Sequence, residues 1–180
     1  MFMKSLIYKI ASILVILSTA ALIGCSGKNA DSLSGKPYDE ERDPAVIIDG
    51  KSFSVKGDID ELLAAVPGSY EYSEALSCMT AGYDKTYDYG FIVIETVPSG
   101  EKDRISRISV TGEGAETPRG IKVGSTRSDI VNAYGENGFI ENSNLVFSKK
   151  GDKNDISGTK IYFRLEDDIV TEFIVFDPGF

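Results

Sequence analysis

The sequence predicts an α+β fold in which two tandem helix-plus-antiparallel-hairpin repeats form one sheet, with the helices on one face. One observation is a recurring pair of glycines: Gly57 and Gly68 bracket one short helical segment, Gly124 and Gly135 bracket another, and both pairs are offset by 67 residues. A second is that β-branched and aromatic runs follow each segment. We therefore expect an internal duplication, with repeat one at about 53–110 and repeat two at about 120–176. Because few residues are identical between the halves, coincidence remains the alternative.

The first repeat is expected to follow a small hairpin and to contain a capped helix. Residues 45–55 form two extended runs around Asp49-Gly50, a dipeptide that favours the tight turn of a two-residue hairpin. Asp58 then suits an N-cap, with Glu61 three residues later. The buried stripe of this helix is expected to comprise Leu62, Leu63 and Val66. Residues 69–90 show no helical period, so we expect loop and short strand before the hairpin formed by 91–97 and 104–110.

The second repeat is built around residues 117–136. Ser125 or Thr126 offers an N-cap oxygen, and Asp129 lies three residues after Thr126, where a carboxylate suits the positive end of a helix. Gly135 can take the left-handed conformation that closes the helix. The packing face of this helix is expected to comprise Ile130, Val131 and Ala133. Strands are then expected at 145–148, 159–165 and 169–176.

Residues 1–24 are typical of a lipoprotein signal peptide. Lys4 and Lys9 precede an uncharged, largely apolar run at 10–23, which is shorter than the roughly 20 residues that span a bilayer. The run ends at Leu22-Ile23-Gly24-Cys25, which resembles the lipobox of bacterial lipoproteins. That resemblance implies that Cys25 carries a diacylglyceryl group and that cleavage occurs in front of it. A transmembrane anchor and a buried cysteine in an ordinary signal peptide are the alternatives.

Residues 25–44 are predicted to be a flexible lipidated tether in front of an α+β domain at 45–180. The segment is rich in Ser, Gly, Asp, Lys and Pro, although docking of Tyr38 on the domain is an alternative for its last residues. Without residues 1–24 the chain has 17 basic and 28 acidic side chains, a balance that disfavours nucleic acid and anionic lipid. We therefore expect the lipid on Cys25 to hold the protein at the outer face of the cell membrane, after export by the general pathway.

The composition argues against catalysis. The chain has no His, which excludes Ser–His and Cys–His nucleophile pairs and His-based metal sites. Cys78 is interpreted as a small buried residue rather than a nucleophile. Residues 152–158 are superficially similar to a calcium loop, but they lack its alternating oxygen ligands and closing Glu. We therefore expect a protein that is not an enzyme and that has no cofactor and no metal.

The run Gly120-Ile121-Lys122-Val123-Gly124, with the helix that follows it to Gly135, resembles the signature of SmpA/OmlA-type envelope lipoproteins and of the β-lactamase-inhibitor-protein-like fold. Residues 77–79, 84–87, 91–97 and 117–135 are more similar to an uncharacterised group of lipoproteins from clostridia and their relatives. The resemblance covers about residues 45–176. It implies a tandem α+β unit and a protein-binding role. The chain departs from the inhibitor branch in lacking Trp and an obvious disulfide.

The expected function is a non-enzymatic protein-binding module of the cell envelope; the alternative is an inhibitor or sensor of a secreted enzyme. The alternation of the last two strands predicts the binding surface. Thr171, Phe173 and Val175 should face the helices, as Ser106, Ile108 and Val110 should in repeat one. The opposite, uncovered face should carry Ile105, Arg107, Tyr162, Arg164, Val170, Glu172 and Ile174. A merely solvated face is the alternative, and the loop from Tyr83 to Tyr89 is the alternative site.

Overall fold

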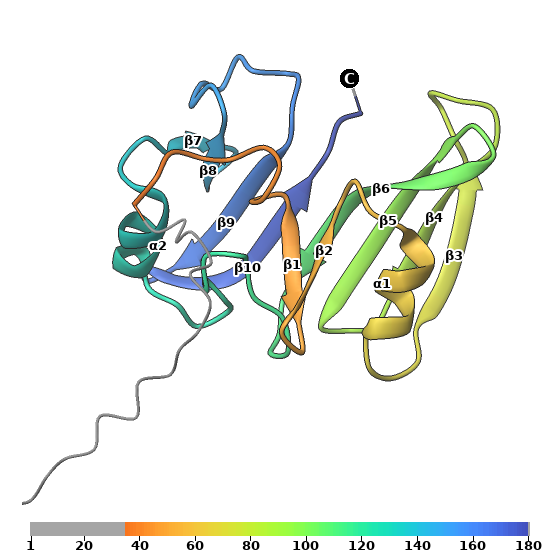
Figure 1. The fold of residues 1–180 in the computed structure, drawn as a ribbon, viewed down its shortest axis with the longest axis horizontal. Coiled ribbons are helices and arrows are strands. Elements are labelled where there is room, and N and C mark those ends of the chain that lie inside the picture. Colours follow the sequence, from red (N-terminus) through yellow and green to blue (C-terminus); the bar gives the residue numbers. More distant parts are fainter. Residues whose placement is uncertain (1–34, 180) are drawn as a thin grey trace, which may run out of the picture. The chain divides into compact units, whose positions relative to one another are not determined.

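The computed structural model describes residues 35–179, and an eight-stranded antiparallel sheet dominates them (Figure 1). The strand order is β3-β4-β5-β6-β10-β9-β8-β7, so β6 and β10 meet at the centre of the sheet. A separate two-stranded sheet, β1-β2, lies earlier in the chain. The predicted signal peptide and Cys25 lie outside the described residues.

The elements before the middle of the chain are β1 (Ala45–Ile48), β2 (Lys51–Ser54), α1 (Ile59–Ala65), β3 (Glu71–Leu76), β4 (Tyr83–Asp88), β5 (Ile92–Ser99) and β6 (Lys102–Val110). The elements after it are α2 (Arg127–Tyr134), β7 (Phe139–Glu141), β8 (Asn144–Ser148), β9 (Lys160–Glu166) and β10 (Ile169–Phe176). Both helices are short, and the structure between 35 and 179 is mostly β.

The predicted fold class is therefore wrong. The described chain is a large antiparallel sheet with two small helices, and four strands, not a hairpin, follow each helix. The prediction of loop and short strand at 69–90 missed β3 and β4. All six residues of β3 are exposed, so burial does not alternate between its two faces.

One face of the sheet carries the core. Ile94 and Ile108 lie opposite each other, as do Phe163 and Phe173, and all four side chains are fully buried. The cluster also includes Leu62 from α1 and Val66 directly after it, Val46 and Ile48 from β1, and Ile130, Ala133 and Tyr134 from α2. The helices and the small hairpin thus pack on the same side of the large sheet, because their only strongly apolar surfaces are these residues.

The predicted hairpin turn and both predicted N-caps are confirmed, whereas Glu61 completes no capping box at α1 and Gly135 has φ 79° with ψ −171°, outside the left-handed helical region. Asp49 and Gly50 both have positive φ, as a two-residue hairpin turn requires. The Asp58 side chain accepts a hydrogen bond from the Asp60 N–H at the start of α1. Thr126 and Asp129 form a complete capping box at the start of α2, in which each side chain accepts a hydrogen bond from the other residue's N–H.

Two β-bulges change the predicted side-chain directions. Strand β6 pairs Arg107 with Glu95 and Ile105 with Thr96, so Ser106 is an extra residue. Strand β10 carries a similar extra residue, Thr171, between Val170 and Glu172. An extra residue shifts the alternation by one position and returns the preceding side chain to the core face. Ile105 and Val170, predicted to face outward, are consequently buried in the core.

Residues 35–44 pack on the domain, so the predicted tether does not extend to residue 44. The anchor is Arg119, whose side chain is buried with that of Asp43. Arg119 donates to both carboxylate oxygens of Asp43, at 2.7 and 2.6 Å, and to the carbonyls of Lys36, Pro37 and Ala133. All five guanidinium N–H groups are thus used. The Tyr38 hydroxyl donates to Thr159 at 3.0 Å, which confirms the alternative that Tyr38 docks.

Among residues 35–179, neither helix has the length and apolar character that crossing a membrane requires.

Candidate functional site

The sheet face opposite the helices brings together most of the predicted binding residues. Tyr162 lies opposite Ile174, and Arg164 lies opposite Glu172, on the strands β9 and β10. Arg107 on β6 lies opposite Phe176, which shares this face. Ile105 and Val170 are the exceptions among the residues predicted for this face, because the bulges in β6 and β10 place them in the core.

The charged groups of this outer face pair with one another. Arg164 forms an ion pair with Glu172 at 2.7 Å, and Arg107 forms one with Glu95 at 3.1 Å. The Arg107 guanidinium also lies over the Phe176 ring, 5.6 Å from its centroid. Burial and the neighbouring Glu141 raise the pKa of Tyr162 above its ordinary value. None of the residues predicted for this outer face belongs to the strongly exposed hydrophobic side chains of 35–179.

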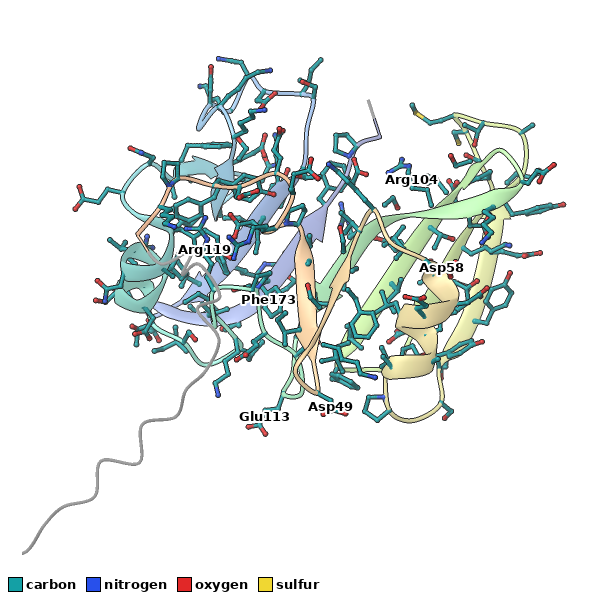
Figure 2. The ribbon with its side chains drawn as sticks, in the orientation of Figure 1. Asp49, Asp58, Arg104, Glu113, Arg119 and Phe173 are labelled. Carbon is teal, nitrogen blue, oxygen red and sulfur yellow. The ribbon has the colours of Figure 1, made fainter. Side chains whose placement is uncertain are left out.

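Those exposed hydrophobic side chains gather on β3, β4 and their connection. Residues 70–83 supply five of the eight in the described chain: Tyr70 (43% exposed), Tyr72 (49%), Leu76 (73%), Met79 (79%) and Tyr83 (47%). Two half-buried neighbours, Tyr87 and Tyr89, continue the group. We call these seven residues the tyrosine surface. Figure 2 shows side chains projecting from β3 at the outer edge of the sheet.

Strand register explains why the tyrosines share a face. Tyr72 lies opposite Tyr87, and Tyr87 lies opposite the core residue Ile94. This row therefore points to the side of the sheet on which α1 packs. The helix covers the inner strands, whereas β3 is exposed along its whole length. The rings of Tyr72 and Tyr87 are 5.4 Å apart, and Tyr70 contacts both Tyr87 and Tyr89 at 5.2 and 5.1 Å.

A cleft of about 410 Å³ adjoins the tyrosine surface, between the start of α1 and strands β4 and β6. Its rim carries two ion pairs, Lys85–Asp103 at 2.6 Å and Lys102–Asp58 at 3.2 Å. Figure 2 shows Asp58 at the start of α1. The N-cap hydrogen bond from Asp60, followed by that from Lys102, lowers the pKa of Asp58. The hydrogen bond to Asp103 raises the pKa of Lys85.

The side chains of this region offer contact area and hydrogen bonds. Aromatic rings, hydroxyls and paired charges line it, and the hydrogen bond to Glu74 raises the pKa of Tyr72 to about 12, so its hydroxyl stays protonated. Within residues 35–179 no group of three His, Cys, Asp or Glu side chains is placed to hold a metal ion. In the loop that resembles a calcium site, Asp155 instead accepts from Lys150 at 2.8 Å.

Sequence reasoning missed the centre of this site. It named the segment from Tyr83 to Tyr89 as an alternative, but it did not name Tyr70 or Tyr72. The available signal was the spacing of those two tyrosines, two residues apart, which places them on one face of a strand. Cys78, interpreted as buried, is exposed in the connection between β3 and β4, because that connection leaves the sheet.

Comparison with protein-family models, with curated proteins and with solved structures gives no match. Function is therefore inferred from the residues and their geometry.

Proposed function

We propose that this protein is a membrane-anchored, extracytoplasmic lipoprotein that acts as a non-enzymatic protein-binding module of the cell envelope. The observation that carries the binding role is the tyrosine surface. Contiguous exposed hydrophobic side chains on a folded domain mark interaction sites, and tyrosine is enriched in protein interfaces. Its rings offer large contact areas at low entropic cost, while the hydroxyls stay hydrated in the free protein.

The anchoring role rests on the sequence around Cys25. A charged start, a short apolar run and Leu22-Ile23-Gly24-Cys25 stand in the order that a lipobox requires. Replacing Cys25→Ser removes the thiol that would accept the lipid. We expect the variant to lose lipid labelling and to leave the membrane fraction. A variant that is processed and still sediments with membranes as the parent does would rule the lipid anchor out.

Affinity capture with two matched double variants tests the binding role. Tyr72→Ser with Tyr83→Ser removes exposed rings from the tyrosine surface, whereas Tyr162→Ala with Arg164→Ala changes the outer face. We expect the first pair to abolish capture of a specific partner by the full-length protein, and the second to leave it intact. The reverse result would move the site to the outer face, where the Arg107–Phe176 contact makes a smaller aromatic patch.

An inhibitor or sensor of a secreted enzyme is the second candidate function. It is favoured by the exposed tip of the β3–β4 hairpin, where Leu76, Met79 and Tyr83 stand together. Such a tip fits an active-site cleft better than a flat partner. Capture of an enzyme whose activity falls on titration with this protein, and recovers with Met79→Ser, would select this function.

A further inference from the structure

Strand β3 is an edge of the large sheet, and no other strand within residues 35–179 pairs with its outer side. It has six residues, contains no Pro and pairs with β4 without a register shift. At the other edge, β7 has only three residues. Natural proteins blunt sheet edges because unpaired N–H and C=O groups attract further strands. In this sheet one edge is blunted by its shortness, and the other is open.

The hydrogen-bond pattern shows which backbone groups of β3 are directed outward. The Ser77 N–H donates to the Gly82 carbonyl, so Ser77 and the residues at two-residue steps before it bond to β4. On the other side of β4, the Tyr89 N–H donates to the Ile92 carbonyl at the pairing with β5. Tyr89 and the residues at two-residue steps before it therefore bond to β5, and the residues between them bond to β3, which agrees with the pattern at Ser77. Tyr72, Glu74 and Leu76 therefore direct their N–H and C=O groups away from β4, toward the open edge.

The charge around this edge is strongly negative. Residues 56–103 contain ten Asp or Glu and three Lys. Each of those lysines is in an ion pair, namely Lys56 with Glu41, Lys85 with Asp103, and Lys102 with Asp58. Glu71 and Glu74 lie on β3 itself, one on each face of the strand. The surface beside the edge thus attracts cations and repels anions.

We propose that β3 binds a basic, extended polypeptide segment of a partner protein, which adds to the large sheet as a further strand. This inference rests on the proposed binding function and names the chemistry of its partner. The backbone groups of Tyr72, Glu74 and Leu76 supply the strand pairing. The side chains beside them supply the selectivity.

Each alternate side chain of the added strand meets a defined neighbour. On the α1 side, a Lys or Arg beside Glu74 forms an ion pair, and a cation beside Tyr72 lies over its ring. An apolar residue beside Leu76 covers the most exposed aliphatic side chain of β3. On the opposite face, Glu71 favours a second basic residue. The preferred segment therefore carries basic residues beside Glu71, Tyr72 and Glu74 and an apolar residue beside Leu76.

A second copy of this chain is a poorer occupant. Pairing two β3 strands would bring two acidic surfaces together, and a pair centred on Glu74 would place the two Glu74 carboxylates opposite each other. Like charges opposed across a sheet are destabilising, and the three lysines of residues 56–103 already form ion pairs with other carboxylates. The negative charge thus acts against self-association and in favour of a basic strand.

The test uses the full-length protein and two synthetic peptides of equal length. One alternates Lys with Thr, and its control alternates Glu with Thr. We expect the lysine peptide to bind at least about tenfold more tightly than the glutamate peptide, with an affinity that falls as salt is raised. Hydrogen exchange should slow at the amides of Tyr72, Glu74 and Leu76 when the lysine peptide is present.

Three variants separate strand addition from general attraction. The double variant Glu71→Gln with Glu74→Gln should bind the lysine peptide about tenfold more weakly than the parent does. Glu166→Gln changes an exposed position on β9 and should leave the affinity for this peptide unchanged. Glu74→Pro should abolish binding, because it removes an outward N–H while leaving the β3–β4 hydrogen bonds. Thermal melts of each variant verify that the domain is folded.

Lysine-peptide binding that is indifferent to these β3 variants, or that protects no β3 amide, would overturn the proposal. Concentration-dependent dimers with protected β3 amides would overturn it in favour of a second copy. A partner that is captured through the tyrosine surface but leaves β3 amides unprotected would refute strand addition while retaining the proposed binding function. Loss of partner capture in Tyr72→Ser with Tyr83→Ser tests that function separately.

Discussion

Arg119 is the residue on which the placement of the N-terminal segment depends. Arg119, labelled in Figure 2, joins Asp43 and the carbonyls of residues 36 and 37 to the end of α2. Its guanidinium lies 4.5 Å from the centroid of the Tyr134 ring. A buried, fully hydrogen-bonded guanidinium has no replacement among other side chains, because only Arg offers five fixed donors. Neither the ion pair nor its burial follows from sequence spacing, since 76 residues separate the partners.

The first prediction concerns this pair. Arg119→Ala leaves Asp43 buried without its counter-charge, so we expect a loss of about 3–5 kcal/mol in the free energy of unfolding. Chemical denaturation of the full chain measures it. The matched control is Arg127→Ala, whose ion pair with Asp168 is exposed and should be worth less than about 1 kcal/mol. Equal effects of the two variants would show that the buried pair does not fix residues 35–44.

Asp129 provides a prediction that depends on pH. The N–H and hydroxyl of Thr126 donate to its carboxylate and lower its pKa below 3.8. A depressed pKa in the folded state means that the contribution to stability is present above the unfolded pKa and is lost as pH falls through the folded value. We expect Asp129→Asn to lower the melting temperature at neutral pH, with a difference that shrinks below pH 3.8.

Thermal melts across acidic pH test this, with Glu166→Gln, exposed on β9, as the control. A difference between Asp129→Asn and the parent that persists unchanged in strong acid would contradict the role of the ionised carboxylate.

At the scale of elements, the sequence predicted those segments that alternate burial or carry complete caps. Both helices, the β1–β2 turn and strands β5, β6, β9 and β10 fall in this group, because β-branched runs, Asp49-Gly50 and the capping box are local signals. Strand β3 lacked such a signal, since every side chain in it is exposed. The predicted fold class failed for that reason.

The residues of the outer face were predicted only in part, and bulges explain the residues that were placed on the wrong face. Alternation placed Tyr162 and Arg164 on the outer face correctly. The same alternation failed for Ile105 and Val170. One extra residue in β6 and one in β10 exchange the two faces of the strand for the residues that precede each bulge. A bulge is defined by how a strand pairs with its neighbour, so it cannot be predicted from the residue pattern of one strand alone.

Helix α2 gives the prediction that belongs to this scale. Ile130 is fully buried in the core cluster, so Ile130→Asp buries an unpaired charge and should cost several kcal/mol of stability. Ser128→Asp is the matched control, because Ser128 is exposed in the first turn, where a carboxylate is tolerated. Denaturant midpoints that agree between the two variants would show that this face of α2 does not contribute to the core.

In the domain formed by residues 35–179, the two ends of the sheet differ in what covers them. The end formed by β7–β10 is closed by α2, residues 35–44 and the Arg119 hydrogen bonds. The end formed by β3 and β4 extends beyond α1 and carries the exposed aromatic side chains and the open edge. The exposed apolar side chains of residues 70–83 and the open edge thus lie at the same end of the sheet.

The measurement that tests this account most directly is site-specific photo-crosslinking of the full-length protein in intact cells. A photoreactive amino acid replaces Tyr72 in one variant and Tyr162, on the opposite face of the sheet, in a matched variant. We expect a discrete crosslinked protein from position 72 and none from position 162, because exposed apolar surface gathers around Tyr72. A crosslinked protein from position 162 alone, or from neither position, would contradict the assignment of the tyrosine surface as the binding site.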